Sequence, residues 1–287
     1  MARGIDHLVV AVRDLDVAAR FYERLGFRVG NRNRHPWGTE NRLIQFPGTF
    51  IELITVGEGA SIAPHGPRFF SFGAFIHDYL SRREGLAMLV LDSQGAKEDA
   101  AQFAGAGIGD YEPFFFERKG LRPDGSETHV AFTLAFARDE AAPGMGYFVC
   151  QHHFPENFWN RKFQDHPNHA TTLSTVAAAA PSPARHERFL ARLTGGSSSG
   201  ATGEDLSFTL SRGRLDVVTL DDAGEIYGSV EEDPGQPSFV AFAVRVEDVD
   251  RQASCLAAAE IPYNQIGSRL IVPASAAFGV AIAFEPD

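Results

Sequence analysis

Residues 5–27, IDHLVVAVRDLDVAARFYERLGF, decide how this chain folds. Residues 5–12 are a β-branched, apolar run, which predicts a strand. Asp14 is a residue type that caps helices and Gly26 is one that ends them. Between them, four apolar residues repeat at the spacing of one helix face: Ala18, Phe21, Tyr22 and Leu25. The stretch therefore predicts a strand followed by an amphipathic helix.

Three further strands are predicted, at residues 27–32, 41–46 and 49–56, with Pro47 and Gly48 forming the turn between the last two. Together with the first strand and helix they make a βαβββ unit.

The same order of elements begins again at three later places in the chain. Their first strands read LAMLVLD from Leu86, ATTLSTV from Ala170 and SFVAFAVRV from Ser238. The starts are separated by roughly 80, 80 and 70 residues, so the chain is interpreted as an internal repeat. The predicted fold class is α+β, built from four βαβββ modules.

Composition limits the partners and the compartment. The 26 basic and 37 acidic residues give a formal charge of -11, which disfavours binding to nucleic acid or to an anionic membrane surface. Only Cys150 and Cys255 are present, so no disulfide framework is expected. The apolar runs are far shorter than the roughly 20 residues of a membrane span. We expect a cytoplasmic protein with a small-molecule partner, no nucleic acid and no membrane.

The run at residues 6–27 resembles the opening of a vicinal oxygen chelate module, as in glyoxalase I and the extradiol dioxygenases. HPWGTENRLIQF (35–46), TFIELI (49–54) and the His-Pro-Asn run at 166–168 are similar to the glyoxalase-like proteins of that superfamily. The resemblance implies that two modules pair into a curved mixed sheet whose concave face holds a divalent metal. It predicts a glyoxalase-like domain at 1–165 and a degenerate one at 166–287.

The resemblance also implies where the metal ligands lie. His7 matches the first-strand histidine and Glu52 the last-strand carboxylate. In the second module, Leu86 and Ala87 occupy the first-strand position and offer no ligand, whereas Gln151, His152 and His153 stand near the last one. Alternation along a strand sends these two histidines to opposite faces, and His152 is preferred. The metal is Fe, Zn, Mn or Ni, and the open coordination positions would receive substrate or oxygen.

Three functional interpretations follow. The first is a metal-dependent lyase, isomerase or dioxygenase acting on a small oxygenated metabolite, with Glu52 and His35 as catalytic residues. In it, substrate contacts come from His35, Asn41 and Trp159, the last in a segment expected to pack over the site. The second is a metal-free protein that binds or sequesters a small molecule. The third makes the C-terminal half a metal-free structural domain that buries the first half or mediates a homodimer.

Plainer roles compete with these. His7 is also typical of a hydrogen-bonded core histidine, and Glu52 of a buried carboxylate paired with an arginine such as Arg42. His35 can serve only to close its loop. A basic patch offers a site for a carboxylate, although a solvated loop is its ordinary role: Arg118, Lys119 and Arg122.

Overall fold

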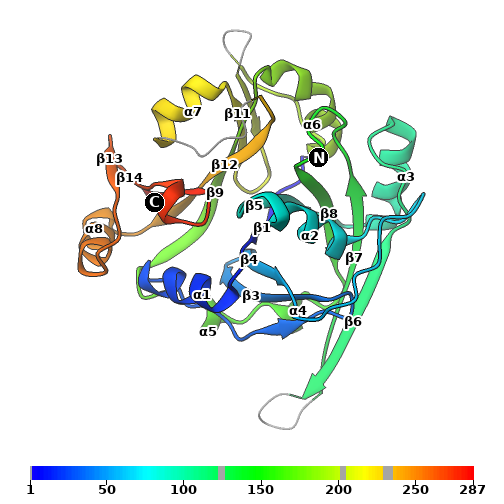
Figure 1. Cartoon of the computed structure of the whole chain (residues 1–287), viewed down its shortest axis with the longest axis horizontal. Helices are drawn as coiled ribbons and strands as arrows, with labels where there is room; N and C mark the ends of the chain where they lie inside the picture. The colour runs from blue at the N-terminus through cyan, green and yellow to red at the C-terminus, as the bar shows by residue number, and fades with distance from the viewer. Residues whose placement is uncertain (1, 122–126, 201–204, 229–234) are drawn as a thin grey trace.

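The structure is a computed structural model that describes residues 2–121, 127–200, 205–228 and 235–287. It contains two mixed β-sheets (Figure 1). The first runs in the order β2-β3-β4-β1-β5-β8-β7-β6. Its strands are β1 (Ile5–Ala11), β2 (Asn33–Arg34), β3 (Thr39–Phe46), β4 (Thr49–Val56), β5 (Gly85–Asp92), β6 (Phe114–Leu121), β7 (Glu127–Ala137) and β8 (Gly146–His152). Its helices are α1 (Leu15–Arg24), α2 (Phe72–Arg82), α3 (Ala96–Ala106), α4 (Pro155–Phe158) and α5 (Arg161–Gln164).

The second sheet runs in the order β10-β11-β9-β12-β15-β14-β13. Its strands are β9 (Ala170–Ala179), β10 (Leu206–Thr209), β11 (Arg214–Val218), β12 (Ser238–Val246), β13 (Asn264–Ile266), β14 (Arg269–Val272) and β15 (Ala281–Pro286). Around it lie α6 (Glu187–Thr194), α7 (Leu220–Tyr227), α8 (Val249–Ala258) and the 3-10 turns η1 (Pro183–His186) and η2 (Ala274–Ala276). Two curved mixed sheets with interspersed helices confirm the predicted α+β class. No helix among the described residues is long and apolar enough to cross a membrane.

The first module forms as its sequence predicts. The Asp14 side chain accepts hydrogen bonds from the backbone N–H groups of Asp16 and Val17, which satisfies two free donors at the start of α1. Gly26 follows the helix with a φ of 93°, a conformation that favours glycine. The apolar stripe of α1 is buried against the sheet, as Ala18 and Tyr22 show. The capping residue and the period of the apolar residues were therefore enough to predict this helix.

Three elements differ from the prediction. Residues 28–32 form no strand, and β2 is reduced to Asn33–Arg34. One reason is that the backbone N–H of Arg28 donates to the His166 ring instead of to a neighbouring strand. Helix α2 was not predicted, and it lies between the first two modules. The third module has two strands after α6, and α7 follows them.

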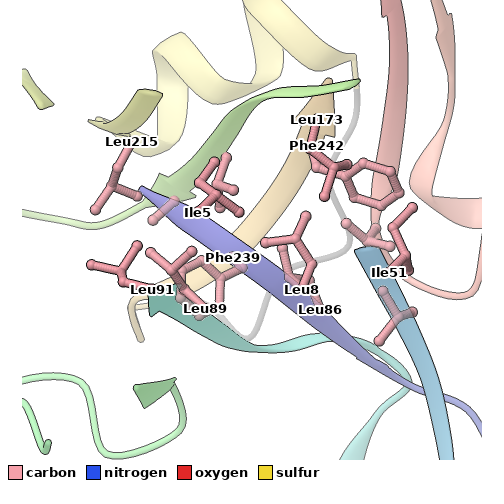
Figure 2. Packing of buried hydrophobic residues seen from close by; sticks show 14 of the residues in the cluster. Ile5, Leu8, Ile51, Leu86, Leu89, Leu91, Leu173, Leu215, Phe239 and Phe242 are labelled. Carbon is pink, nitrogen blue, oxygen red and sulfur yellow. The ribbon is translucent and has the colours of Figure 1, made fainter. Parts of the chain in front are cut away.

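One face of each sheet packs against the other sheet in a single apolar core (Figure 2). From the first sheet, Ile5 and Leu8 of β1 and Leu89 of β5 enter it. From the second sheet come Leu173 of β9 and Phe242 of β12. These side chains are almost completely excluded from water, so the hydrophobic effect holds the two sheets together. The opposite face of each sheet does not contact the other sheet and needs a different element to shield it from water.

A helix covers that opposite face in both sheets, and in both it follows the last strand of the odd-numbered module. On the second sheet, α7 places Ala223 and Tyr227 on a floor of small residues: Ala177, Ala179, Ala241, Ala243, Ala281 and Ala283. Small side chains allow the helix to lie close to the strands. On the first sheet, α2 places Phe72, Ile76 and Tyr79 on the corresponding face. There large side chains hold the helix away from part of the sheet, and a cavity remains on this face.

His166 fastens the segment between the sheets to the first module. Its Nδ1 accepts a hydrogen bond from the backbone N–H of Arg28 at 3.0 Å, and its Nε2 lies 2.8 Å from the backbone oxygen of Gln45, to which it donates. The contact with Arg28 requires the neutral ring, because a protonated Nδ1 cannot accept a hydrogen bond. Burial lowers the pKa of His166 from its ordinary 6.5 to about 4, against the opposing effect of the Gln45 carbonyl.

This pKa predicts a loss of stability in acid. Above pH 6.5 His166 is neutral in both the folded and the unfolded chain, and below it only the unfolded chain gains the proton. A pKa lowered to about 4 corresponds to about 3 kcal/mol of folding free energy, lost as the pH falls from 6.5 towards 4. Urea unfolding of the wild type and of His166→Gln should therefore show a stability difference that shrinks over this pH range. A difference that is constant with pH would contradict the assignment.

Candidate active site

The concave face of the first sheet encloses a cavity of about 180 Å³. Its walls are mainly aromatic: Phe50, Phe72, Phe116, Phe132, Phe148 and Phe158. Among its polar lining residues are His7, Glu52, His35 and Asn41, with Asn33 and Arg118 from the two edge strands. An apolar cavity with a few convergent polar groups is the usual form of a small-molecule site.

His7 projects from β1 and is fixed by a ring stack and a hydrogen bond. Its ring stacks on Phe50, with centroids 4.2 Å apart, and its Nδ1 lies 2.5 Å from Asp6 Oδ1. In the neutral ring, donation from Nδ1 to this carboxylate leaves the lone pair on Nε2. Nε2 faces Glu52, at 3.9 Å from Oε2. One imidazole nitrogen is therefore oriented and free of a hydrogen bond at the cavity.

Glu52 reaches the same point from β4, which pairs in parallel with β1 and places Glu52 beside Val9. It is almost fully buried, with 6% of its surface exposed. The Asn41 side chain donates from Nδ2 to Glu52 Oε1 and so fixes the carboxylate. The alternative partner Arg42 is wrong, because its guanidinium instead binds Asp16 at 2.9 Å.

The pairing register shows which residues of the second module correspond to His7 and Glu52. Leu8 pairs with Ile51, and Leu89 pairs with Tyr147. When the second pair is superposed on the first, Met88, just before Leu89, corresponds to His7, just before Leu8. In the same way Phe148, just after Tyr147, corresponds to Glu52, just after Ile51. The matching first-strand residue is thus Met88, one position beyond the predicted Leu86 and Ala87. Neither Met88 nor Phe148 provides a nitrogen or oxygen ligand.

His152 and His153 lie in different surroundings. His152 lies beside the cavity's polar cluster, with Nε2 at 3.0 Å from Asp6 Oδ2. The orientation is not that of a hydrogen bond, so both of its buried ring nitrogens lack a hydrogen-bond partner. His153 is exposed and contacts Thr133 Oγ1 at 2.8 Å. The structure brings His152, and not His153, close to His7.

Asp6 joins the two histidines. Burial acts to raise the pKa of Asp6, but contact with His152 and then with His7 lowers it to about 2. The side chain is therefore an anion at neutral pH. Asp6, Cys150 and His152 have ligand-type atoms within 4.8 Å of one another and are the one such group of three in the described part of the chain. His7, Glu52 and His152 are spread more widely than that.

Cys150 is a neutral thiol in this surrounding. Burial raises its pKa well above the usual range, and the nearby Asp6 and Glu52 raise it further. A thiolate would have to share an apolar, anionic pocket, so Cys150 is not an activated nucleophile here.

Of the residues predicted to meet substrate, His35 and Asn41 line the cavity together. His35 Nε2 lies 3.3 Å from Asn41 Nδ2, and its Nδ1 lies 2.8 Å from Thr39 Oγ1. Burial lowers the pKa of His35, which the nearby Glu52 opposes and Arg118 reinforces. Trp159 stacks on His152 at 5.6 Å and supports that ring, whereas its neighbour Phe158 faces the cavity.

Asp6 was missed because strand alternation predicts it on the face opposite His7. In the pairing of β1 with β5 the register shifts between Ile5 and His7, which marks a bulge. Both Ile5 and Leu8 enter the core between the sheets, three residues apart rather than two or four. In the sequence, the three-residue spacing of Ile5 and Leu8 was the signal that Asp6 and His7 both point away from the core between the sheets.

The model of the glyoxalase-like domain family matches residues 5–194. The match covers most of the chain, and we conclude that this protein belongs to the glyoxalase-like domain family. Among curated proteins, no sequence gives a significant match.

Solved structures share its fold at low sequence identity. A hypothetical protein from Staphylococcus aureus is 12% identical with a TM-score of 0.70, over 99% of this chain and 100% of that one. A mutant 4-hydroxymandelate synthase from Streptomyces coelicolor is 10% identical with a TM-score of 0.60, over 99% and 92%. Homoprotocatechuate 2,3-dioxygenase from Arthrobacter globiformis is 13% identical with a TM-score of 0.57, over 100% and 80%.

The two buried carboxyl groups of the site predict a stability effect. Replacing Glu52 by Gln keeps an acceptor for Asn41 but removes one acidic group from the anionic floor. In metal-free protein we expect Glu52→Gln to raise the free energy of unfolding by about 1 kcal/mol. Glu140→Gln is the control: this side chain is 80% exposed, so the substitution should change the free energy of unfolding little. If Glu52→Gln instead lost stability in urea titrations, Glu52 would be a structural core residue.

Proposed function

We propose that this protein is a divalent-metal-dependent enzyme of the vicinal oxygen chelate type, acting in the N-terminal cavity on a small molecule with adjacent oxygen atoms. One observation supports the proposal most. Glu52 is buried at the cavity floor and Asp6 is buried behind His7, and no Lys or Arg among the described residues pairs with either. Buried negative charge is costly without a cation, and a divalent ion would supply it.

The donors at the floor fit such an ion. Metal-bound histidines usually donate their other ring nitrogen to a carboxylate, as His7 does to Asp6. Ligand atoms about 2.1 Å from one ion lie roughly 3 to 4 Å apart, and His7 Nε2 and Glu52 Oε2 are 3.9 Å apart. His152 is the third candidate, since both of its ring nitrogens are buried without a hydrogen bond, although Nε2 lies 3.0 Å from the Asp6 carboxylate. His7 and Glu52 are therefore proposed as the ligands that hold the ion. His152 would join them only after its side chain moves, because these three residues do not form a group with ligand atoms within 4.8 Å of one another.

The ion would polarise the vicinal oxygens of a substrate and stabilise negative charge that develops on them. The protein's own residues prepare for this. Asp6 fixes the tautomer of His7, and Asn41 fixes Glu52. His35 has a pKa lowered by burial, so it is neutral at pH 7 and suited to accept a proton. The aromatic walls exclude bulk water.

Metal analysis of a matched pair of histidine variants tests the proposal. Protein is purified without chelator and supplied with Fe, Zn, Mn or Ni in turn. Wild type should retain one equivalent of at least one metal, and His7→Ala should lower the affinity at least 10- to 100-fold. His77→Ala is the control, because His77 lies on the surface and contacts only Asp78 among the described residues. Lack of stoichiometric metal in the wild type would refute the metalloenzyme.

A metal-free binding protein is the second candidate. The observation that favours it is the presence of Met88 and Phe148 where the second module could have supplied ligands. A binding protein should hold small aromatic ligands equally well with and without EDTA, and should not convert them. Loss of ligand binding in EDTA would favour the enzyme.

A further inference from the structure

The mouth of the cavity is closed by contact between the two edges of the first sheet. β2 and β6 are the outermost strands in its order. The Arg118 side chain on β6 nevertheless donates a hydrogen bond to Asn33 Oδ1 on β2 at 2.8 Å. The sheet is therefore curved far enough to bring its edges together over the concave face. Arg118 and Asn33 both line the cavity at this closure.

Asn33 begins a chain of hydrogen bonds that leads to the cavity floor. Its Nδ2 donates to Asn41 Oδ1 at 3.0 Å, and Asn41 in turn donates to Glu52. Every donor in the series points the same way, from the Arg118 cation to the Glu52 carboxylate. Such a series is polarised by the charges at its two ends. A group bound at Arg118 is thus linked to the residue that we propose as a metal ligand.

Arg118 is the cation at the mouth that lacks a carboxylate partner. The other arginine in the lining, Arg34, is paired with Glu40 at 3.0 Å. Glu117, next to Arg118 in sequence, contacts His129 at 2.8 Å. Within the described ranges Arg118 makes no ion pair, and the asparagine oxygen it binds carries no net charge. An arginine fork of this kind is suited to a carboxylate.

The space between Arg118 and the floor suits one aromatic ring. The cavity measures about 180 Å³, and roughly 150 Å³ is enough for benzene. Phe116 and Phe132 stack at 5.0 Å on the wall nearest Arg118, and Trp37 meets Phe116 at 5.0 Å. Flat apolar surfaces of this kind pack well on another ring.

We propose that the substrate is a small aromatic acid whose carboxylate binds Arg118 at the mouth while its adjacent oxygens face His7 and Glu52. The proposal rests on the proposed function, since it uses the metal end of the same cavity. Arg118 is then a specificity-determining residue. The predicted basic patch is reduced to this one side chain, because Lys119 does not line the cavity and Arg122 lies outside the described residues.

Matched acid and amide probes test the proposal by titration calorimetry. Metal-loaded protein is titrated with 3,4-dihydroxybenzoate and 3,4-dihydroxybenzamide, and metal-free protein with benzoate and benzamide. In both forms the wild type should bind the acid more tightly. Arg118→Gln should weaken binding of the acid about 5- to 20-fold and leave the amide unchanged, because only the acid loses a charge-assisted hydrogen bond.

The control variant is Arg34→Gln, which removes a neighbouring charge that Glu40 already compensates and should not alter the preference. Equal binding of acid and amide by the wild type, equal weakening of both by Arg118→Gln, or no binding of either acid would overturn the proposal. If the acids bind more tightly than the amides but metal does not increase their affinity, the proposed metal centre would be wrong and the Arg118 subsite would stand. If metal increases the affinity but acid and amide bind equally, the metal centre would stand and the Arg118 subsite would be wrong.

Discussion

The contact of Asp6 with two imidazole rings is the interaction on which the rest of the site depends. A bulge in β1 brings Asp6 and His7 to the same side of the strand, so one carboxylate touches both His7 and His152. These contacts hold Asp6 ionised although it is buried. They also leave Nε2 of His7 facing Glu52. Without Asp6, the first and last strands of the domain would lose the group that orients His7 and lies 3.0 Å from His152.

The two halves of the chain use one architecture for different purposes. Each sheet buries one face in the shared core and covers the other with a helix that follows the last strand of its first module. In the second half, alanines let α7 pack directly on the strands. In the first half, large aromatic side chains surround a cavity and polar groups converge on its floor. Side-chain size on this face thus decides whether the helix packs on the strands, as in the second sheet, or a cavity remains, as in the first.

The sequence predicted the features that depend on local chemistry. The Asp14 cap, the α1 stripe and the starts of the four modules follow from residue type and spacing. Alternation correctly separates His152 from His153, but the concave side was known only from the structure. Asp6 was missed because a bulge breaks alternation. The Arg118–Asn33 contact joins residues 85 positions apart at two sheet edges, and no local pattern predicts such a contact.

Anomalous X-ray scattering from crystals of the metal-loaded protein tests the central claim most directly. At the absorption edge of the bound metal, we expect a single strong peak at the floor of the N-terminal cavity, bonded to His7 Nε2 and to the Glu52 carboxylate. A peak held by Asp6, Cys150 and His152 without His7 would contradict this ligand set. The absence of any peak at the cavity floor, in crystals that contain the metal, would contradict the metal centre itself.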